Sequence, residues 1–446
     1  MAKDLTKGKS FPVLLQFTLP VIGGNLFQLF YTLADTVIVG RTLGAQALAA
    51  VGSTTIIIYF VLCFIQGFTG GFGICLGQRF GAQDTPGMRR SVAVSWGLSL
   101  VFTVAVTALT CGLTHQILHW MQTPDSIYQD AYDYMFVVLL GTGATVFYNM
   151  ISNMLRALGD SRTPLVFLVF SALLNVVLDV VFIVPFQMGV AGAAWATVVS
   201  QFLSAALCTV VGVKKFEVLR TSCSDLTDWQ KAAWQHLRIG FPMGFQMSVM
   251  CIGQLAMQAA VNALGPVAIA GYTAATKVDQ LSVLMNNAFG IALSNFVAQC
   301  YGAGLYGRIR EGVRASLIQT EVANLFMCVL LLACRNAVTP FFIDNPTAET
   351  IQYANGYLLA VAPFYVILGL LLVFRTAVQS MGNSRAPFAA CLVELVMRIG
   401  GTFGLSHVLG YTGICLSSPL AWAGATSLLI PVYVSEIRHH AMKENR

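Results

Sequence analysis

The chain has 446 residues, of which 57% are apolar and only 10% are charged, with a formal net charge of +6. Soluble domains carry roughly 25% charged residues, so this composition excludes a soluble globular protein. Apolar stretches of about 20 residues recur along the chain, and each is long enough to cross the ~30 Å hydrocarbon core of a bilayer as a helix.

We therefore predict an all-α integral membrane protein with twelve transmembrane helices. The predicted spans lie near residues 15–40, 47–76, 91–114, 128–152, 164–185, 190–213, 239–263, 268–299, 313–333, 350–374, 387–407 and 412–435. The eleven cysteines lie mostly inside these spans, so we interpret them as small reduced core residues rather than metal ligands.

The first span carries a polar stripe. Asn25, Gln28, Thr32 and Asp35 are spaced by 3, 4 and 3 residues, which places them on one helix face. A carboxylate at mid-membrane depth costs a few kcal/mol (about 3) on insertion scales, so Asp35 is functional by default. Pro20, about four turns earlier, is a predicted hinge because proline removes a helical hydrogen bond.

The fifth and sixth spans add a second acid. Asn175 and Asp179 are spaced i, i+4 on one helix face, and Thr197 lies in the next span. Together with Asp35, these residues offer two carboxylates, an amide oxygen and a hydroxyl, which suit Na⁺, or two acids that share one proton. The alternative is that these groups only hydrogen-bond helices together. No other metal and no cofactor is expected.

The sequence contains an internal repeat that covers both halves of the chain. Gly159 to Pro164, GDSRTP, returns as GNSRAP at Gly382 to Pro387, and further matches keep an offset of 221 to 223 residues. We predict two six-helix bundles related as a parallel internal repeat. The predicted boundaries are an N-terminal lobe at 1–213, a cytoplasmic linker at 214–238, a C-terminal lobe at 239–435 and a cytoplasmic tail at 436–446.

The second half has a similar frame and different chemistry. At the repeat offset, Asp35 maps near Gln258 and Asp179 maps to Thr402, so the acidic pair exists only in the first half. Glu394 and Arg398 are spaced i, i+4 with the acid first, which favours an ion pair. Lys277 and Asp279 are interpreted as beginning the eighth span near the membrane surface, and Glu321 is left unassigned.

We predict that polar and aromatic residues of the first, second and seventh spans contact the substrate. They are Gln28, Tyr31, Thr32, Tyr59, Gln254, Gln258 and Asn262.

The Lys and Arg residues are unevenly distributed between the two sides of the predicted membrane. With an even number of spans both termini share a side, and Lys and Arg gather on that side, whereas Arg41 and Arg335 fall opposite. This bias predicts that both termini are cytoplasmic. Because the charge follows topology, it predicts a lipid bilayer as partner and no nucleic acid.

Pro20, Asp35, the Ala47-Leu48-Ala49-Ala50 segment, the duplicated loops and Asn175-x-x-x-Asp179 resemble the multidrug and toxic compound extrusion (MATE) family over nearly the whole chain. The resemblance implies two bundles around a V-shaped central cleft and export of bulky organic cations in exchange for H⁺ or Na⁺. In the DNA-damage-inducible (DinF-like) branch it implies a cation site at the positions of Asp35, Asn175, Asp179 and Thr197. Another branch has essential acids in spans 7 and 10, where this chain has none.

We predict a monomeric multidrug efflux transporter of the cell membrane that exports small amphipathic molecules by antiport with H⁺ or Na⁺. The alternative is a lipid-linked oligosaccharide or lipid flippase, which would need a more basic cavity for pyrophosphate. A channel would need a ring of selectivity residues. An enzyme would need a reactive constellation, and the sequence contains no His-Glu-x-x-His, nucleophile elbow or phosphate-binding loop.

Overall fold

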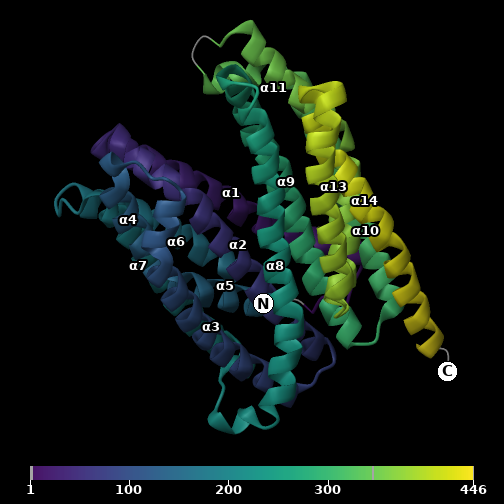
Figure 1. Cartoon of the computed structure of the whole chain (residues 1–446). Helices are drawn as coiled ribbons and strands as arrows, with labels where there is room; N and C mark the ends of the chain where they lie inside the picture. The colour runs from purple at the N-terminus through teal and green to yellow at the C-terminus, as the bar shows by residue number, and fades with distance from the viewer. Residues whose placement is uncertain (1–3, 344–345, 445–446) are drawn as a thin grey trace. The chain divides into compact units, whose positions relative to one another are not determined.

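The computed structural model describes residues 4–343 and 346–444, which form long helices joined by short turns (Figure 1). The first half holds α1 (Ser10–Leu43), α2 (Ala45–Gly81), α3 (Thr85–Trp120), α4 (Asp125–Leu140), α5 (Thr142–Ala157), α6 (Arg162–Ile183) and α7 (Gly189–Lys215). The short turns η1 (Glu217–Leu219) and η2 (Cys223–Leu226) lead to the second half. That half holds α8 (Trp229–Asn262), α9 (Pro266–Gly302), α10 (Tyr306–Phe342), α11 (Ala348–Val361), η3 (Ala362–Phe364), α12 (Tyr365–Ser380), α13 (Arg385–Leu409) and α14 (Tyr411–Glu444).

The predicted all-helical membrane architecture is confirmed. Within the described residues, 11 helical segments are long and apolar enough to cross a membrane, or 12 when the bent pair α4 and α5 counts as one span. That pair bends by 41° at Gly141, where a side chain would collide with Val198 of α7. The corresponding span of the second half is interrupted by η3, which contains Pro363. Glycine lacks a side chain, and proline lacks the backbone N–H that a helix needs, so both residues permit a break in a helix.

Two compact units make up the chain, and their limits differ from the predicted lobes. The first unit holds Gly23–Phe245, and the second holds Leu5–Ile22 with the described residues from Gln246 onward. The beginning of α1 therefore packs with the second unit, and the beginning of α8 packs with the first. Each change of unit falls close to the repeated proline of its helix, Pro20 or Pro242. The polar linker predicted at 214–238 does not coincide with the change of unit, which falls inside α8 between Phe245 and Gln246.

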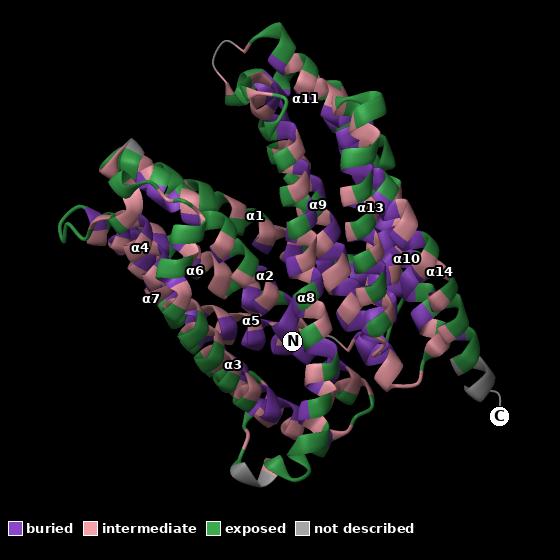
Figure 2. Cartoon of the chain, in the orientation of Figure 1, coloured by how far each residue is buried: buried purple, intermediate pink, exposed green. Residues whose placement is uncertain are grey.

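Large apolar side chains remain exposed along both units, as the green helix faces in Figure 2 show. Val101 and Leu109 of α3 and Val396 and Val408 of α13 are each more than half exposed. In water such faces would be costly, whereas lipid is their natural solvent. Many polar side chains are buried instead, so each unit places its chemistry inside and its apolar surface outside.

The segment before α1 is fixed to the second unit. The backbone N–H of Leu5 donates to Gln299 Oε1 at 3.0 Å, and the guanidinium of Arg308 donates to the carbonyls of Leu5, Lys7 and Gly8. Leu5 itself is buried in the apolar cluster around Phe296. These contacts explain why Leu5 and the residues that follow it belong to the second unit.

Close helix packing gives the glycines of α2 a structural role. A Cβ atom at Gly71 would lie 2.6 Å from the Cα atom of Gly240 in α8, which is main chain and cannot rotate away. We expect Gly71→Ala to destabilise the protein by about 1–3 kcal/mol through overpacking. The matched control is Gly97→Ala in α3, where nothing lies within 4 Å of the added methyl group. Thermal unfolding in detergent checks this, and equal melting temperatures for the two variants would contradict it.

The repeated turn between α5 and α6 is organised by Asp160. Gly159 has a φ of 85°, as expected for a residue that ends a helix. α6 begins at Arg162, and Asp160 Oδ1 accepts from the N–H groups of Arg162 and Thr163. Lys215 Nζ donates to Asp160 Oδ2 at 2.5 Å. A carboxylate is a strong acceptor for these donors.

Asp160 makes stability depend on pH. Burial alone would raise the pKa of Asp160, but hydrogen bonds from Lys215 and Thr163 outweigh it and lower the pKa. A lowered folded-state pKa contributes stability above the unfolded-state value, and this contribution is lost as pH falls through the folded-state value. We therefore expect Asp160→Asn to cost about 1–2 kcal/mol at neutral pH and almost nothing well below about pH 4.

The second repeat supplies the control for this prediction. Asn383 occupies the equivalent position and accepts from the Ala386 N–H through Oδ1, so an amide can organise the turn without a charge. Thermal unfolding of the wild type and of Asp160→Asn, from acid to neutral pH, measures how much stability the Asp160 carboxylate contributes at each pH. A constant difference at every pH would show that the charge of Asp160 contributes nothing.

Candidate functional site

The two acids predicted from the first half meet in the first unit. Asp35 of α1 is half-buried, and Asp179 of α6 is 0% exposed. Their carboxyl groups adjoin each other. Both oxygens of Asp179 and Oδ1 of Asp35 are buried and receive no hydrogen bond from a donor group in the described part of the chain. Two adjoining acids without a donor form a place where a proton or a cation is needed.

Asn175 and Thr197 complete the set of four. Asn175 lies one turn before Asp179 on α6 and is fully buried, and its Nδ2 donates to Thr197 Oγ1 at 3.2 Å. Because the amide nitrogen is used in this way, Asn175 Oδ1 is left without a partner among the described residues. The site therefore presents an amide oxygen beside the two carboxyl groups.

Two tyrosines also belong to this site. The hydroxyl of Tyr31 in α1 lies 3.3 Å from Thr197 Oγ1, so Thr197 links α1, α6 and α7. Tyr134 of α4 lies within electrostatic range of Asp35, Asp179 and Tyr31. Sequence reasoning placed Tyr31 among substrate contacts and missed Tyr134, because a single tyrosine in an apolar span carries no spacing signal.

This arrangement suits a hard monovalent cation or a proton. Carboxylate, amide and hydroxyl oxygens are the ligand types that alkali and alkaline-earth cations accept. A shared proton would instead join the two carboxyl groups and remove one of the two charges. Either ligand lowers the electrostatic cost of burying both acids.

The other predicted contacts of the first unit lie on exposed surface. Gln28 and Thr32 are exposed on α1, and Thr32 Oγ1 donates to the backbone carbonyl of Gln28. Tyr59 of α2 is 54% exposed. Pro20 lies inside α1, which is helical on both sides of it. Substrate contact at the three side chains and hinge motion at Pro20 remain predictions.

In the second unit, the predicted polar residues of α8 also lie toward the surface. Gln254 and Asn262 are exposed, and Gln258 Nε2 donates to Asn262 Oδ1 at 2.8 Å. Their role as a polar wall remains a prediction.

Glu394 is bound by two arginines. Arg398 Nη2 lies 2.7 Å from Glu394 Oε1, one turn along α13, and Arg375 Nη2 of α12 lies 2.5 Å from Glu394 Oε2. Helical spacing predicted Arg398 as a partner. It carried no information on Arg375, which comes from another helix.

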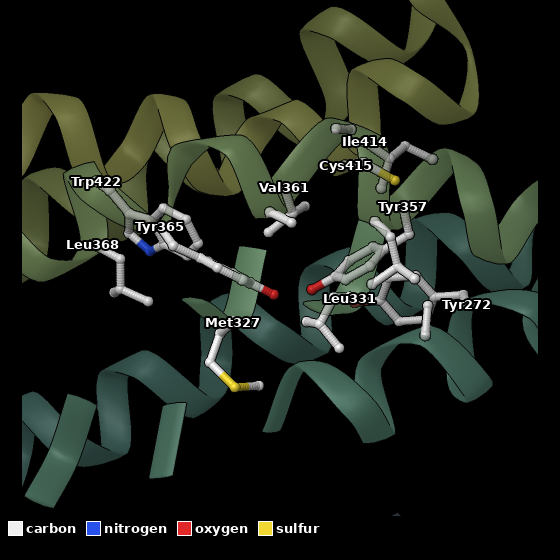
Figure 3. Packing of buried hydrophobic residues seen from close by; sticks show 14 of the residues in the cluster. Tyr272, Met327, Leu331, Tyr357, Val361, Tyr365, Leu368, Ile414, Cys415 and Trp422 are labelled. Atoms are coloured by element: carbon white, nitrogen blue, oxygen red, sulfur yellow. The ribbon is translucent and has the colours of Figure 1, made fainter. Parts of the chain in front are cut away.

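Asp279 was predicted to lie at the start of its helix, and this prediction is wrong. It lies well inside α9, which begins at Pro266, and it accepts hydrogen bonds from the hydroxyls of Tyr357 and Tyr365. Figure 3 shows these two hydroxyls pointing toward each other from the apolar cluster that also holds Tyr272 and Trp422. Lys277, by contrast, is exposed.

Glu321 of α10 can now be placed. Both of its carboxyl oxygens are buried without a hydrogen-bond partner in the described residues. It adjoins Asn324 and the backbone of Gly369, where an added Cβ atom would lie 2.5 Å from Glu321 Oε1. The second unit thus buries acid groups of its own, although the sequence left the surroundings of Glu321 unassigned.

Comparison with known proteins gives a consistent picture. The MatE family pattern matches residues 20–181 and 242–403, two segments displaced by the spacing of the internal repeat. "Probable multidrug resistance protein YpnP" of Bacillus subtilis (strain 168) is 31% identical over 423 residues, covering 93% of each chain. The "FAD transporter" of Shewanella oneidensis is 24% identical, covering 92% of this chain and 91% of that protein.

Solved structures share the fold. The structure described as "Outward-facing conformation of a multidrug resistance MATE family transporter of the MOP superfamily" superposes with a TM-score of 0.91. The two sequences are 21% identical, and the match covers 98% of each chain. At this identity the likeness concerns the fold alone.

Proposed function

The chain belongs to the MatE family, and from this premise we propose that it is a secondary active exporter of amphipathic small molecules, organic cations included, driven by H⁺ or Na⁺ antiport. It is a multi-pass membrane protein and a transporter rather than an enzyme. The names of its relatives, a probable multidrug resistance protein and an FAD transporter, support export of drug-like molecules without fixing one substrate class.

One observation supports cation binding in the first unit: Asp35 and Asp179 adjoin, and within the described residues no donor reaches Asp35 Oδ1 or either oxygen of Asp179. Transporters of this family use ion coupling. We assign the coupling ion to Asp35, Asn175, Asp179 and Thr197, and we expect the DinF-like mode of coupling through the first unit. In this proposal the protein acts as a monomer in the cell membrane, with both termini cytoplasmic.

The proposed mechanism follows from electrostatics. Binding of H⁺ or Na⁺ from outside neutralises the acid pair and permits α1 to repack near Pro20, which lowers the affinity for the exported molecule. The loaded ion is released to the cytoplasm in the inward-open state. Coupling requires only that the ion and the substrate prefer different conformations.

The experiment is efflux of ethidium from proteoliposomes under an imposed pH gradient, an imposed Na⁺ gradient, or neither. We expect one gradient to drive efflux by the wild type and neither to drive it in Asp35→Asn. The gradient that works identifies the ion. Gradient-independent movement that is equal in both proteins would sink antiport for this substrate class and favour the flippase alternative.

A further inference from the structure

The second unit carries three buried charged side chains whose charges do not cancel. Arg375, Glu394 and Arg398 are 3%, 2% and 5% exposed. Two guanidinium groups and one carboxylate leave a formal charge of +1. A buried, uncompensated charge in a membrane protein is expensive, and it marks a functional site by default. The proposed cation site in the first unit does not use it.

The geometry leaves donors free. Each arginine bonds one oxygen of Glu394 through one nitrogen, although a guanidinium presents five N–H donors in a planar fork. The Nε atoms of Arg375 and Arg398 are buried without a partner in the described chain. Arg375 Nη1 lies 3.7 Å from the sulfur of Met250, a weak acceptor. A planar anion is the complement of such unused, fixed donors.

The other acids within the spans of the second unit form no ion pair with these arginines in the described residues. Asp279 accepts from Tyr357 and Tyr365, and Glu321 lies beside Asn324 without a hydrogen-bond partner in the described chain. Across residues 4–343 and 346–444, Glu394 is the one carboxylate within ion-pair distance of either arginine. The missing negative charge is therefore not supplied by this part of the chain.

The set lies at a close-packed seam between α8 and α13, which has no room for a water molecule as the side chains stand. Met250 and Gly253 of α8 line one side, and Leu395 lines the other with Glu394 and Arg398. Gly253 lets the backbone of α8 pack directly against Arg398, since a Cβ atom there would lie 3.2 Å from Arg398 Nη1. Met250, which covers Arg375, has an unbranched and adaptable side chain. Movement of this side chain is the simplest way to admit a ligand.

We propose that Arg375 and Arg398 bind the anionic group, a carboxylate or a phosphate, of an amphipathic transport substrate. Glu394 holds the two guanidinium groups in place and reduces their combined charge, so that the anion can leave again. This inference rests on the proposed export function and extends its substrates to amphipathic anions.

The test is equilibrium binding to the full-length protein in detergent, measured by fluorescence anisotropy with fluorescein as the anion and ethidium as the cation. We expect Arg375→Gln and Arg398→Gln each to weaken fluorescein binding by about tenfold or more and to leave ethidium binding within about twofold. Arg375→Lys should give an intermediate loss, because it keeps the charge and loses the fork. Arg385→Gln, which removes the same charge from an exposed position on α13, is the matched control.

Competition shows which anionic group is preferred. Displacement of fluorescein by decanoate or by decyl phosphate, and not by decyltrimethylammonium, supports the proposal and selects carboxylate or phosphate. Equal displacement by all three, equal loss of both dyes in the arginine variants, or equal loss in Arg385→Gln would overturn it. Melting temperatures verify that each variant is folded.

Failure of this inference is distinguishable from failure of the proposed function. The binding measurement needs no gradient, whereas the efflux measurement does. Ion-driven ethidium efflux with arginine-independent fluorescein binding refutes the anion site alone. Arginine-dependent fluorescein binding without ion-driven efflux supports the anion site and refutes antiport.

Discussion

Replacing Asp179 by asparagine is expected to reduce gradient-driven ethidium efflux to the level of protein-free liposomes. Asparagine keeps the size of the side chain and removes the carboxyl group, so the site can no longer alternate between charged and neutral states. The gradient then has no group through which it shifts the conformational equilibrium. Because Asp179 is 0% exposed and adjoins Asp35, no neighbouring solvent replaces this function.

The control is Asp125→Asn, an exposed acid in the first turn of α4, which should leave efflux unchanged. Equilibrium ethidium binding should survive in Asp179→Asn, because the change affects coupling rather than the substrate. Gradient-driven efflux that persists in Asp179→Asn would place the coupling ion elsewhere in the molecule, with Glu321 of α10 as the next buried acid to test.

Stability separates coupling from helix-to-helix bonding at this site. If Asp179 served only to hold helices together, its replacement would lower the melting temperature. The structure predicts no such loss, since neither carboxyl oxygen of Asp179 accepts a hydrogen bond in the described residues. A neutral amide there relieves the repulsion between two acids, and functional sites commonly trade stability for activity in this way.

Helix periodicity and the cost of a buried charge selected residues that the structure brings together in the first unit. Asp35 was recognisable because a charge at mid-span is costly, and Asn175 and Asp179 because residues four apart share a face. The internal repeat then showed that the second half lacks the acid pair. The spacing of residues along one helix and the free-energy cost of burying a charge in a bilayer can both be judged from the sequence, without knowledge of tertiary structure.

Partners from other helices could not be predicted in this way. Arg375 of α12 forms an ion pair with Glu394 of α13, and Tyr134 of α4 lies within electrostatic range of the acid pair. Asp279 was interpreted as beginning a span near the membrane surface, whereas Tyr357 of α11 and Tyr365 of α12 donate hydrogen bonds to it within the unit. The change of unit within α1 and α8 was hidden for the same reason: local composition does not specify which neighbour a helix packs against.

The largest stability effect is expected at Glu394. Its replacement by glutamine leaves two buried guanidinium groups with no counter-charge, a loss that typically costs about 3–5 kcal/mol. Arg375→Gln should cost much less, because Glu394 and Arg398 then form a neutral pair one turn apart on α13. The free energy of unfolding in mixed micelles measures both, with Glu349→Gln, an exposed acid of α11, as the unaffected control.

A double variant decides whether charge or packing is responsible. If net charge dominates, Glu394→Gln combined with Arg375→Gln leaves one unpaired arginine instead of two and should be more stable than Glu394→Gln alone. If packing dominates, the double variant should be no more stable than Glu394→Gln alone, although the two losses overlap because the side chains contact each other. A more stable double variant would show that uncompensated positive charge, rather than lost packing, destabilises this part of the second unit.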